Sequence, residues 1–358
     1  MKKANKVKIY GQVTRPLRAD VLRALPDLLP SLRVTRADPS SRAGAELVVD
    51  VLTPSGRKRR LYVETRAASA PSRIPDALRQ LKASLGARAA GYPVLASSFL
   101  SPRARELCRE AGVGYLDLAG NCYLQFEDFY FQKIVEDNPF PARGRPASLC
   151  TPVSSRILRA LLEEPARGWR VSELASAAQV SLGQTSNVCR RLIGEAYAVK
   201  RDRRVHLTEP GRLLEAWREA YAIPRQTLLA YYSFERSPEQ LVRRVAQVAA
   251  ERRWRYALTS FTAATRVAPF VHGIGTTQWY LADALSVDGW VEALDLRPAE
   301  SGPNVVVAIP YDPGVFYRTQ TVDDLVLVGN VQLYLDLFSE PARGREQAEF
   351  LRKEKLGF

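Results

Sequence analysis

Residues 1–145 switch repeatedly between the hydrophobic period of a helix and that of a strand. A period of about 3.6 residues predicts helices over 18–29 and 74–90. Apolar or alternating runs predict strands at 45–52, 59–66, 92–99 and 113–118. The first two strands are joined as a hairpin by the turn 53–56, and Ser101-Pro102 opens a further helix that ends at Gly112. This order of helix, hairpin, helix, strand, helix and strand predicts an α/β sheet domain.

The hydrophobic pattern is interrupted twice. The stretch 137–146 contains three prolines and a glycine, which forbid a regular element, and a second break falls at Ile223-Pro224-Arg225. We therefore expect a multidomain chain of α/β plus α+β class. Its predicted domains are an α/β domain over 1–145, a middle domain over 146–222, and an α+β domain over 223–358 that binds a partner or dimerises.

The middle domain has three helical stretches, at 153–164, 171–178 and from Ser181 to about Ala196. Gln179-Val180 forms the turn before the third helix, and Ser181 with Gln184 has the spacing of a capping box. Helical spacing predicts that five residues of the third helix pack inward: Leu182, Thr185, Val188, Cys189 and Leu192. After this helix, residues 197–208 alternate like a hairpin with a basic tip. This order is that of a winged helix-turn-helix, whose third helix enters the major groove of DNA.

The residues left outward on the third helix and on the hairpin can bond base edges or phosphates. The predicted DNA-binding residues are Ser181, Gln184, Ser186, Asn187, Arg190, Arg191, Lys200, Arg201, Arg203 and Arg204. The alternatives are a small helical bundle with an ordinary solvated face, or a winged helix that binds protein.

The charge of the chain is distributed unevenly along its length. The formal net charge is +14, and residues 1–145 carry 25 basic against 14 acidic residues, whereas residues 223–358 carry 15 against 16. A basic first part facing a polyanion and a neutral last part facing another partner would explain this asymmetry. Arginine makes up 42 of the 52 basic residues, so the base composition of a GC-rich genome is an alternative explanation.

Composition argues against several classes of protein. Four cysteines lie far apart and there are only two histidines, so we expect no disulfide framework, no metal site and no cofactor. No apolar run approaches the ~20 residues of a membrane span, and no signal peptide is evident, which predicts a cytoplasmic protein without a membrane partner.

The first domain resembles the restriction-endonuclease-like fold of the PD-(D/E)xK nucleases. In that family an acid on one hairpin strand and an acidic-x-Lys triplet on the next hold a divalent metal. Asp50 stands at the first position, and Glu64-Thr65-Arg66 occupies the triplet. Arg66 departs from the pattern because a guanidinium is never deprotonated, so we expect a domain that keeps the fold for binding without catalysis. The alternative is a metal-dependent DNA endonuclease using Asp50, Glu64 and Arg66, which would require these three to converge.

Four further stretches resemble the AbiEi-family antitoxins and transcriptional regulators of bacterial type IV toxin–antitoxin systems. They are 107–121, 256–265, 331–337 and 342–351. The resemblance implies repression of the protein's own operon and neutralisation of a nucleotidyltransferase-like toxin. Taken alone, Asp117, Gly120 and Asn121 either project polar groups from a sheet end or form a plain hairpin turn.

The last domain reads as an α+β module with helices at 238–253 and 260–267 and strands at 255–258, 276–281 and 304–310. A nucleotidyltransferase site needs a Gly-Ser turn and an Asp-x-Asp pair, but Thr259-Ser260 lacks the glycine and Asp283 has no partner two residues away. Trp279, Tyr280 and Trp290 are residues of a type that anchors protein interfaces and equally of a type that fills cores.

Together these patterns predict a non-enzymatic, DNA-binding protein, and the resemblance to AbiEi implies a transcriptional regulator and antitoxin. Its expected partners are a double-stranded DNA operator, a cognate toxin protein and a second copy of itself in a homodimer.

Overall fold

A computed structural model describes residues 7–38, 46–66, 70–85, 91–126, 129–135, 139–140, 149–221, 226–273, 275–341 and 343–358. The chain divides into two compact units, one built from the residues up to 146 together with 194–196 and the other from 147–193 and 197–358. We call them the N-terminal and C-terminal units. Most of the interruption predicted at 137–146, and the break at 223–225, lie outside the described residues.

The N-terminal unit is a seven-stranded sheet in which the strands lie in sequence order, from β1 to β7. The strands are β1 (Arg33–Asp38), β2 (Leu47–Leu52), β3 (Lys58–Arg66), β4 (Tyr92–Ser97), β5 (Gly114–Asp117), β6 (Cys122–Phe126) and β7 (Phe129–Lys133). Strands β3, β4 and β5 are mutually parallel, and every other neighbouring pair is antiparallel.

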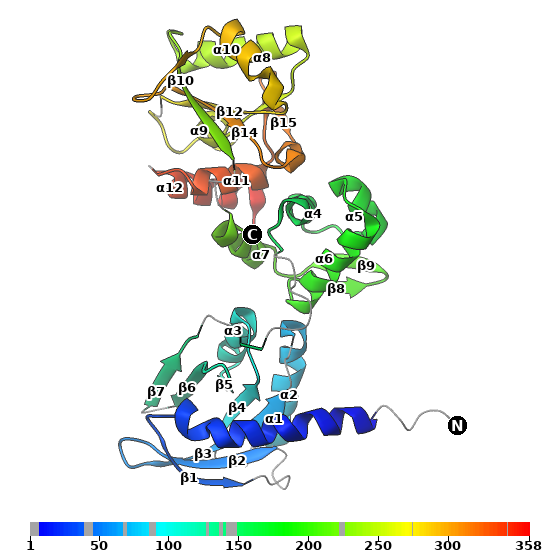
Figure 1. The fold of residues 1–358 in the computed structure, drawn as a ribbon, viewed down its shortest axis with the longest axis vertical. Coiled ribbons are helices and arrows are strands. Elements are labelled where there is room, and N and C mark those ends of the chain that lie inside the picture. The colour runs from blue at the N-terminus through cyan, green and yellow to red at the C-terminus, as the bar shows by residue number, and fades with distance from the viewer. Residues whose placement is uncertain are drawn as a thin grey trace, which may run out of the picture. The chain divides into compact units, whose positions relative to one another are not determined.

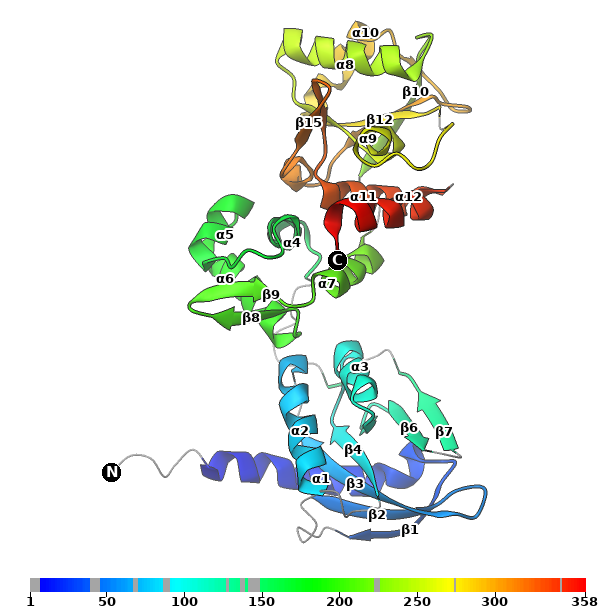
Figure 2. The ribbon, with the colours of Figure 1, turned by 180° about the vertical axis from the view of Figure 1, so that it is seen from behind.

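Helices cover both faces of this sheet. They are α1 (Val7–Leu28), α2 (Ile74–Leu85) and α3 (Pro102–Glu110). Val21 and Leu25 of α1 pack with Val49 and Val63 on one face, whereas Leu78 of α2 belongs to a second cluster on the other face. Figures 1 and 2 show α1 on one side of the sheet and α2 and α3 on the opposite side. The unit is therefore a three-layered α/β structure, which is the class that the hydrophobic pattern predicts.

Three strands of this sheet are absent from the sequence prediction. Strand β1 is largely exposed at the sheet edge, so it has no apolar face to reveal it. Strand β6 follows β5 after the four residues 118–121, and the aromatic residues of β6 and β7 give no clean alternation. The helix start at Ser101 agrees with the prediction, since the Ser101 side chain accepts a hydrogen bond from the Ala104 N–H.

The C-terminal unit begins with three helices and a two-stranded hairpin. These are α4 (Pro152–Glu163), α5 (Val171–Ala178), α6 (Leu182–Gly194), β8 (Ala198–Arg201) and β9 (Arg204–Leu207). Trp169, which is 1 % exposed, pairs with Val205 of the hairpin through backbone hydrogen bonds and so ties the helices to it. We call residues 149–209 the helix–hairpin module. A helix that the sequence prediction omits, α7 (Pro210–Ala220), follows it.

The remainder of this unit, here called the C-terminal module, is built on a seven-stranded mixed sheet in the order β13-β10-β14-β12-β11-β16-β15. The strands are β10 (Thr227–Tyr232), β11 (Tyr256–Leu258), β12 (Thr277–Leu281), β13 (Arg297–Pro298), β14 (Val305–Ile309), β15 (Gln320–Val322) and β16 (Leu325–Leu327). The helices are α8 (Pro238–Arg252), α9 (Ser260–Val267), α10 (Val287–Ala293), α11 (Asn330–Phe338) and α12 (Gly344–Leu351).

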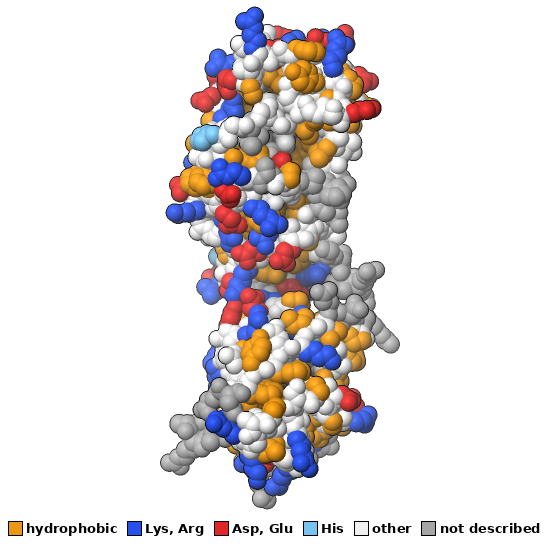
Figure 3. Space-filling model, turned by 90° about the vertical axis from the view of Figure 1, so that its left-hand side faces the viewer, with side chains coloured by type: hydrophobic (Ala, Val, Ile, Leu, Met, Phe, Trp, Pro, Cys, Tyr) orange, Lys and Arg blue, Asp and Glu red, His pale blue; other side chains and the backbone are white. Residues whose placement is uncertain are grey.

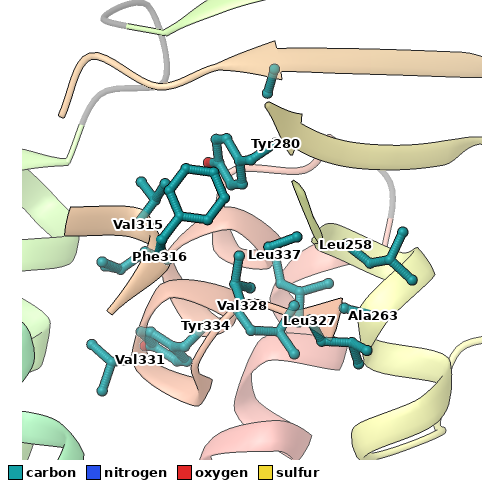
Figure 4. Packing of buried hydrophobic residues seen from close by; sticks show 14 of the residues in the cluster. Leu258, Ala263, Tyr280, Val315, Phe316, Leu327, Val328, Val331, Tyr334 and Leu337 are labelled. Carbon is teal, nitrogen blue, oxygen red and sulfur yellow. The ribbon is translucent and has the colours of Figure 1, made fainter. Parts of the chain in front are cut away.

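Helix α11 lies at the centre of this module. Every residue from Val331 to Leu337 is buried, and Figure 4 shows Val331, Tyr334 and Leu337 packed with Leu327, Val328 and Phe316. Trp279, Tyr280 and Trp290 are at most 2 % exposed, so the interface reading of these aromatics is wrong and they fill the core. One continuous hydrophobic cluster joins this core to that of the helix–hairpin module. Among the described residues, no helix is both long and apolar enough to span a membrane.

Candidate nucleic-acid interface

Helix α6 begins at a serine cap. The Ser181 Oγ accepts a hydrogen bond from the Gln184 N–H at 3.4 Å, and the Ser181 carbonyl accepts one from the Thr185 hydroxyl at 3.0 Å. Thr185, Val188, Cys189 and Leu192 are buried, as the helical period predicts. Leu182 is not: it is 57 % exposed, because the first turn of α6 extends beyond the packed part of the helix.

The opposite face of α6 presents polar groups to solvent. Gln184, Asn187 and Arg190 are exposed, and Ser186 and Arg191 are half-buried. Arg190 Nη1 donates a hydrogen bond to Asn187 Oδ1 at 3.0 Å, so these two side chains are held together one helical turn apart. Three of the five residues predicted to face outward on this helix are therefore exposed, and two are partly covered.

The hairpin ends in a tight turn. Asp202 and Arg203 have φ of 48° and 61°, the left-handed values of a two-residue hairpin turn. Lys200, Arg201 and Arg203 are exposed around this turn. Arg204 differs from them, since its Nη1 donates to the Gly168 carbonyl at 2.8 Å and to Glu173 Oε2 at 3.2 Å. Three of the four predicted basic residues are thus free to meet a ligand, and the fourth is held by the protein.

Helix α4 connects the helix–hairpin module to the C-terminal module. Arg156 makes a double ion pair with Asp312, and Arg159 donates to Gln332 Oε1 on α11 from Nε at 3.0 Å. Arg159 is 1 % exposed and its guanidinium lies 4.9 Å from the Trp217 ring. Because both modules share these contacts and one core, α6 is held in a fixed relation to the C-terminal sheet.

A buried polar cluster continues this connection into the C-terminal module. Asp336 accepts hydrogen bonds from four side chains, those of Tyr221, Thr259, Tyr280 and Gln332. Burial raises the pKa of Asp336 to about 6, although these donors act to lower it. Both hydroxyl groups of Thr259-Ser260 are therefore hydrogen-bonded within the protein, that of Thr259 to Asp336 and that of Ser260 to Glu340.

Two glutamates at the end of α4 also contact the C-terminal module. Glu163 Oε1 accepts from the Val331 N–H at 2.9 Å, and burial raises the pKa of Glu163 to about 7. Burial also acts to raise the pKa of Glu164, but hydrogen bonds from Arg318 and Arg167 outweigh it and hold that pKa below its usual value.

In the N-terminal unit, Asp50 does not lie beside Glu64. Asp50 pairs with Arg60 across the hairpin, and Arg60 Nε donates to Asp50 Oδ1 at 2.7 Å. Glu64 is four residues farther along β3, which is about 13 Å at 3.3 Å per residue. The three candidate nuclease residues therefore do not converge: Arg66 pairs with Glu64 at 2.9 Å, and Asp50 is held elsewhere.

The acid that faces Glu64 is Glu46, which the sequence analysis omits. The register Leu47↔Val63 places Glu46 opposite Glu64, and counting back from the turn 53–56 could have found it. Burial raises the pKa of Glu64, Arg66 acts to lower it, and Glu46 raises it further. Thr65 donates to the Glu46 carboxylate. Within the described residues, no three His, Cys, Asp or Glu side chains form a group that could hold a metal.

The stretch 117–121 forms a buried turn. Asp117 accepts from the N–H groups of Leu100, Ala119 and Asn121, and Asn121 accepts from Arg105 at 2.6 Å. Asp117 and Asn121 are both 0 % exposed. Of the two readings, the hairpin turn is the correct one, and these polar groups stabilise the fold.

Comparison with known families gives a match to part of the chain. Residues 206–356 match the family model described as "Transcriptional regulator, AbiEi antitoxin, Type IV TA system". The matched region covers less than half of the chain and includes the C-terminal module but not α4, α5 or α6. No curated protein and no solved structure matches the chain. The match indicates a transcriptional regulator of a toxin–antitoxin system. More particularly, it supports the similarity to AbiEi antitoxins at 256–265, 331–337 and 342–351, which all lie within the matched region.

Proposed function

We propose that the protein is a DNA-binding transcriptional regulator of the AbiEi type, in which the helix–hairpin module is a winged helix-turn-helix. In this proposal α6 enters the major groove of a double-stranded operator, and the turn between β8 and β9 meets the phosphate backbone. The family match supports the regulatory role, and the order of three helices and a hairpin supports the mode of binding.

The observation that carries the proposal is the exposed face of α6. Gln184, Asn187 and Arg190 have free donors and acceptors of the kind that bond base edges, while the residues between them anchor the helix in the core. Arg190 and Asn187 are held together before any ligand binds, so less side-chain entropy is lost when they meet a base pair. Ser181, Ser186 and Arg191 lie beside them and would add contacts to phosphate.

The finer role proposed for the C-terminal module is to bind a cognate nucleotidyltransferase-like toxin, with repression of the protein's own operon by the whole chain. Support comes from the family description and from the neutral charge of residues 223–358, which suits a protein partner rather than a polyanion. A cytoplasmic location and a homodimer on the operator complete the proposal.

For the N-terminal unit we propose a restriction-endonuclease-like fold without catalysis. Its support is the sheet, in which β2 runs antiparallel to β1 and β3 while β3, β4 and β5 are parallel. The alternative of a metal-dependent endonuclease is less favoured, since Asp50 is bonded to Arg60 and Arg66 occupies the position of the lysine.

The test begins with selection of binding sequences from randomised duplexes by the full chain. Asn187→Ala and Arg190→Ala should each weaken binding to the selected duplex by about 1–3 kcal/mol and relax its sequence preference. Arg243→Ala, an exposed arginine on α8, is the matched control and should bind as the wild type does. Equal losses on selected and random duplexes would contradict base readout by α6.

The antitoxin role is tested separately in cells. Expression of a nucleotidyltransferase-like gene from beside this one should arrest growth, and co-expression of the full chain should restore it. The Asn187→Ala Arg190→Ala chain should also restore growth while losing repression of an operon reporter. Failure of the wild-type chain to restore growth would refute the antitoxin role.

A further inference from the structure

A groove of about 630 Å³ opens on the N-terminal unit, beyond the end of α3. Five aromatic rings line it, those of Tyr92, Tyr123, Phe126, Phe129 and Tyr130, and we call it the aromatic groove. Tyr130 is 62 % exposed and Gln125 is exposed beside it. Figure 3 shows hydrophobic side chains at the surface of this unit with Lys and Arg around them. A groove lined by aromatic side chains with a few polar groups among them is typical of a binding site.

The rings are held in fixed orientations by one another. Phe126 and Phe129 stack with their centroids 5.1 Å apart, and Tyr92 meets the Phe126 ring edge-on at 5.3 Å. Tyr130 stands at 87° to the Tyr123 ring, with the centroids 6.0 Å apart. Gly114 permits this packing, because a Cβ there would lie 2.5 Å from the Tyr92 ring. The aromatic side chains of the groove are therefore already ordered, so binding a ligand would cost them little conformational entropy.

Polar groups stand among these rings. Arg109 lines the groove, its side chain is exposed, and within the described part of the chain it forms no hydrogen bond or ion pair. The Tyr123 hydroxyl donates to Gln125 Oε1, which leaves the Gln125 amide N–H groups available. A cation, an amide and stacked rings in one groove are suited to a flat, polar, anionic ligand better than to an aliphatic one.

We propose that the aromatic groove binds the unpaired bases of a nucleic-acid strand. Bases stack on aromatic side chains, arginine contacts the phosphates or stacks in turn, and amides bond the base edges. Paired bases inside a duplex have no free faces, so double-stranded DNA cannot use the groove in this way. Residues 1–145 carry an excess of 11 positive charges, which favours a polyanion as the partner of this unit, and Arg109 places a positive charge in the groove itself.

This site is separate from α6 and goes beyond the proposed operator binding. The experiment measures anisotropy of labelled oligothymidylate and oligouridylate of about 12 nucleotides with the full chain. Tyr130→Ala should weaken binding of at least one strand about 5- to 140-fold. Tyr130→Phe keeps the ring and should stay within about twofold of the wild type. Ile134→Ala removes an apolar side chain that is 55 % exposed and lies outside the groove, and it should have no effect.

A strand of the same length without bases distinguishes stacking from charge. The abasic strand should bind more weakly than oligothymidylate, and Tyr130→Ala should leave its affinity unchanged. Asn187→Ala Arg190→Ala should not alter binding of the single strands, so failure of operator binding by α6 would leave this result intact. Equal binding of abasic and base-containing strands, or no effect of Tyr130→Ala, would overturn the proposal. Self-association that depends on Tyr130, without strand binding, would assign the groove to a second copy instead.

Discussion

Arg156 on α4 and Asp312 on the C-terminal module form a double ion pair, with Nε to Oδ1 at 2.9 Å and Nη2 to Oδ2 at 2.8 Å. Asp312 is 3 % exposed, and its Oδ1 also accepts from the Gly314 N–H at 2.7 Å. One carboxylate thus caps a turn of its own module and fixes the helix that precedes α5 and α6. The orientation of the proposed reading helix depends on this contact.

Asp312→Ala should therefore lower the free energy of unfolding of the C-terminal unit by about 2–4 kcal/mol. Urea unfolding followed by tryptophan fluorescence measures it, since all five tryptophans lie in this unit. Asp283→Ala is the matched control: Asp283 caps a turn in the same way, through the Leu285 N–H at 2.9 Å, but is exposed. A loss no larger than that of the control would show that the ion pair contributes nothing.

Glu163 and Glu164 should affect the pH dependence of stability with opposite signs. The folded state raises the pKa of Glu163 from 4.5 to about 7, so it binds the proton more tightly than the unfolded state does. The stability from Glu163 is present below pH 4.5 and is lost as the pH rises towards 7. Glu163→Gln should accordingly be more stable than the wild type at pH 8, with the difference shrinking by pH 5.

Glu164→Gln is the control for this experiment. In the wild type, Arg318 and Arg167 hold the pKa of Glu164 below its usual value in the folded state. The Glu164 carboxylate therefore contributes stability above the unfolded pKa, and this stability is lost as the pH falls. This variant should be less stable than the wild type at pH 8. Parallel pH profiles of the two variants would contradict the assignment of the buried proton to Glu163.

Substitutions of the basic residues of the hairpin should differ in their effect on the salt dependence of DNA binding. Arg203→Ala removes an exposed charge at the turn, so the slope of log K against log salt on duplex DNA should fall by roughly 0.9. Arg204→Ala should leave the slope unchanged, because Glu173 and the Gly168 carbonyl already hold that guanidinium. A larger change of this slope in Arg204→Ala than in Arg203→Ala would show that Arg204, and not Arg203, contacts the phosphate.

The N-terminal unit should show no magnesium- or manganese-dependent cleavage of plasmid DNA, and duplex binding should survive chelation. The reason is that Arg66 and Arg60 already offset Glu64 and Asp50 without a metal. Cleavage that appears with manganese and disappears in Glu64→Ala would establish the endonuclease alternative.

Local sequence determined much of this protein. The caps at Ser101 and Ser181, the inward residues Val188 and Leu192, and the hairpin within 197–208 follow from helical period, capping chemistry and strand alternation. These features depend on neighbours a few residues away, so a single sequence can predict them.

Tertiary structure decided what depends on distant partners. Leu182 fits the inward period but reaches beyond the core, and Trp279 and Trp290 are covered by elements that the chain supplies far from them. Glu46 faces Glu64 only through strand register, and Arg204 is held by Glu173 from another helix. Hydrophobic pattern fixes which face of an element is apolar, but only the packed fold fixes which residues cover that face and which charges are left free to bind.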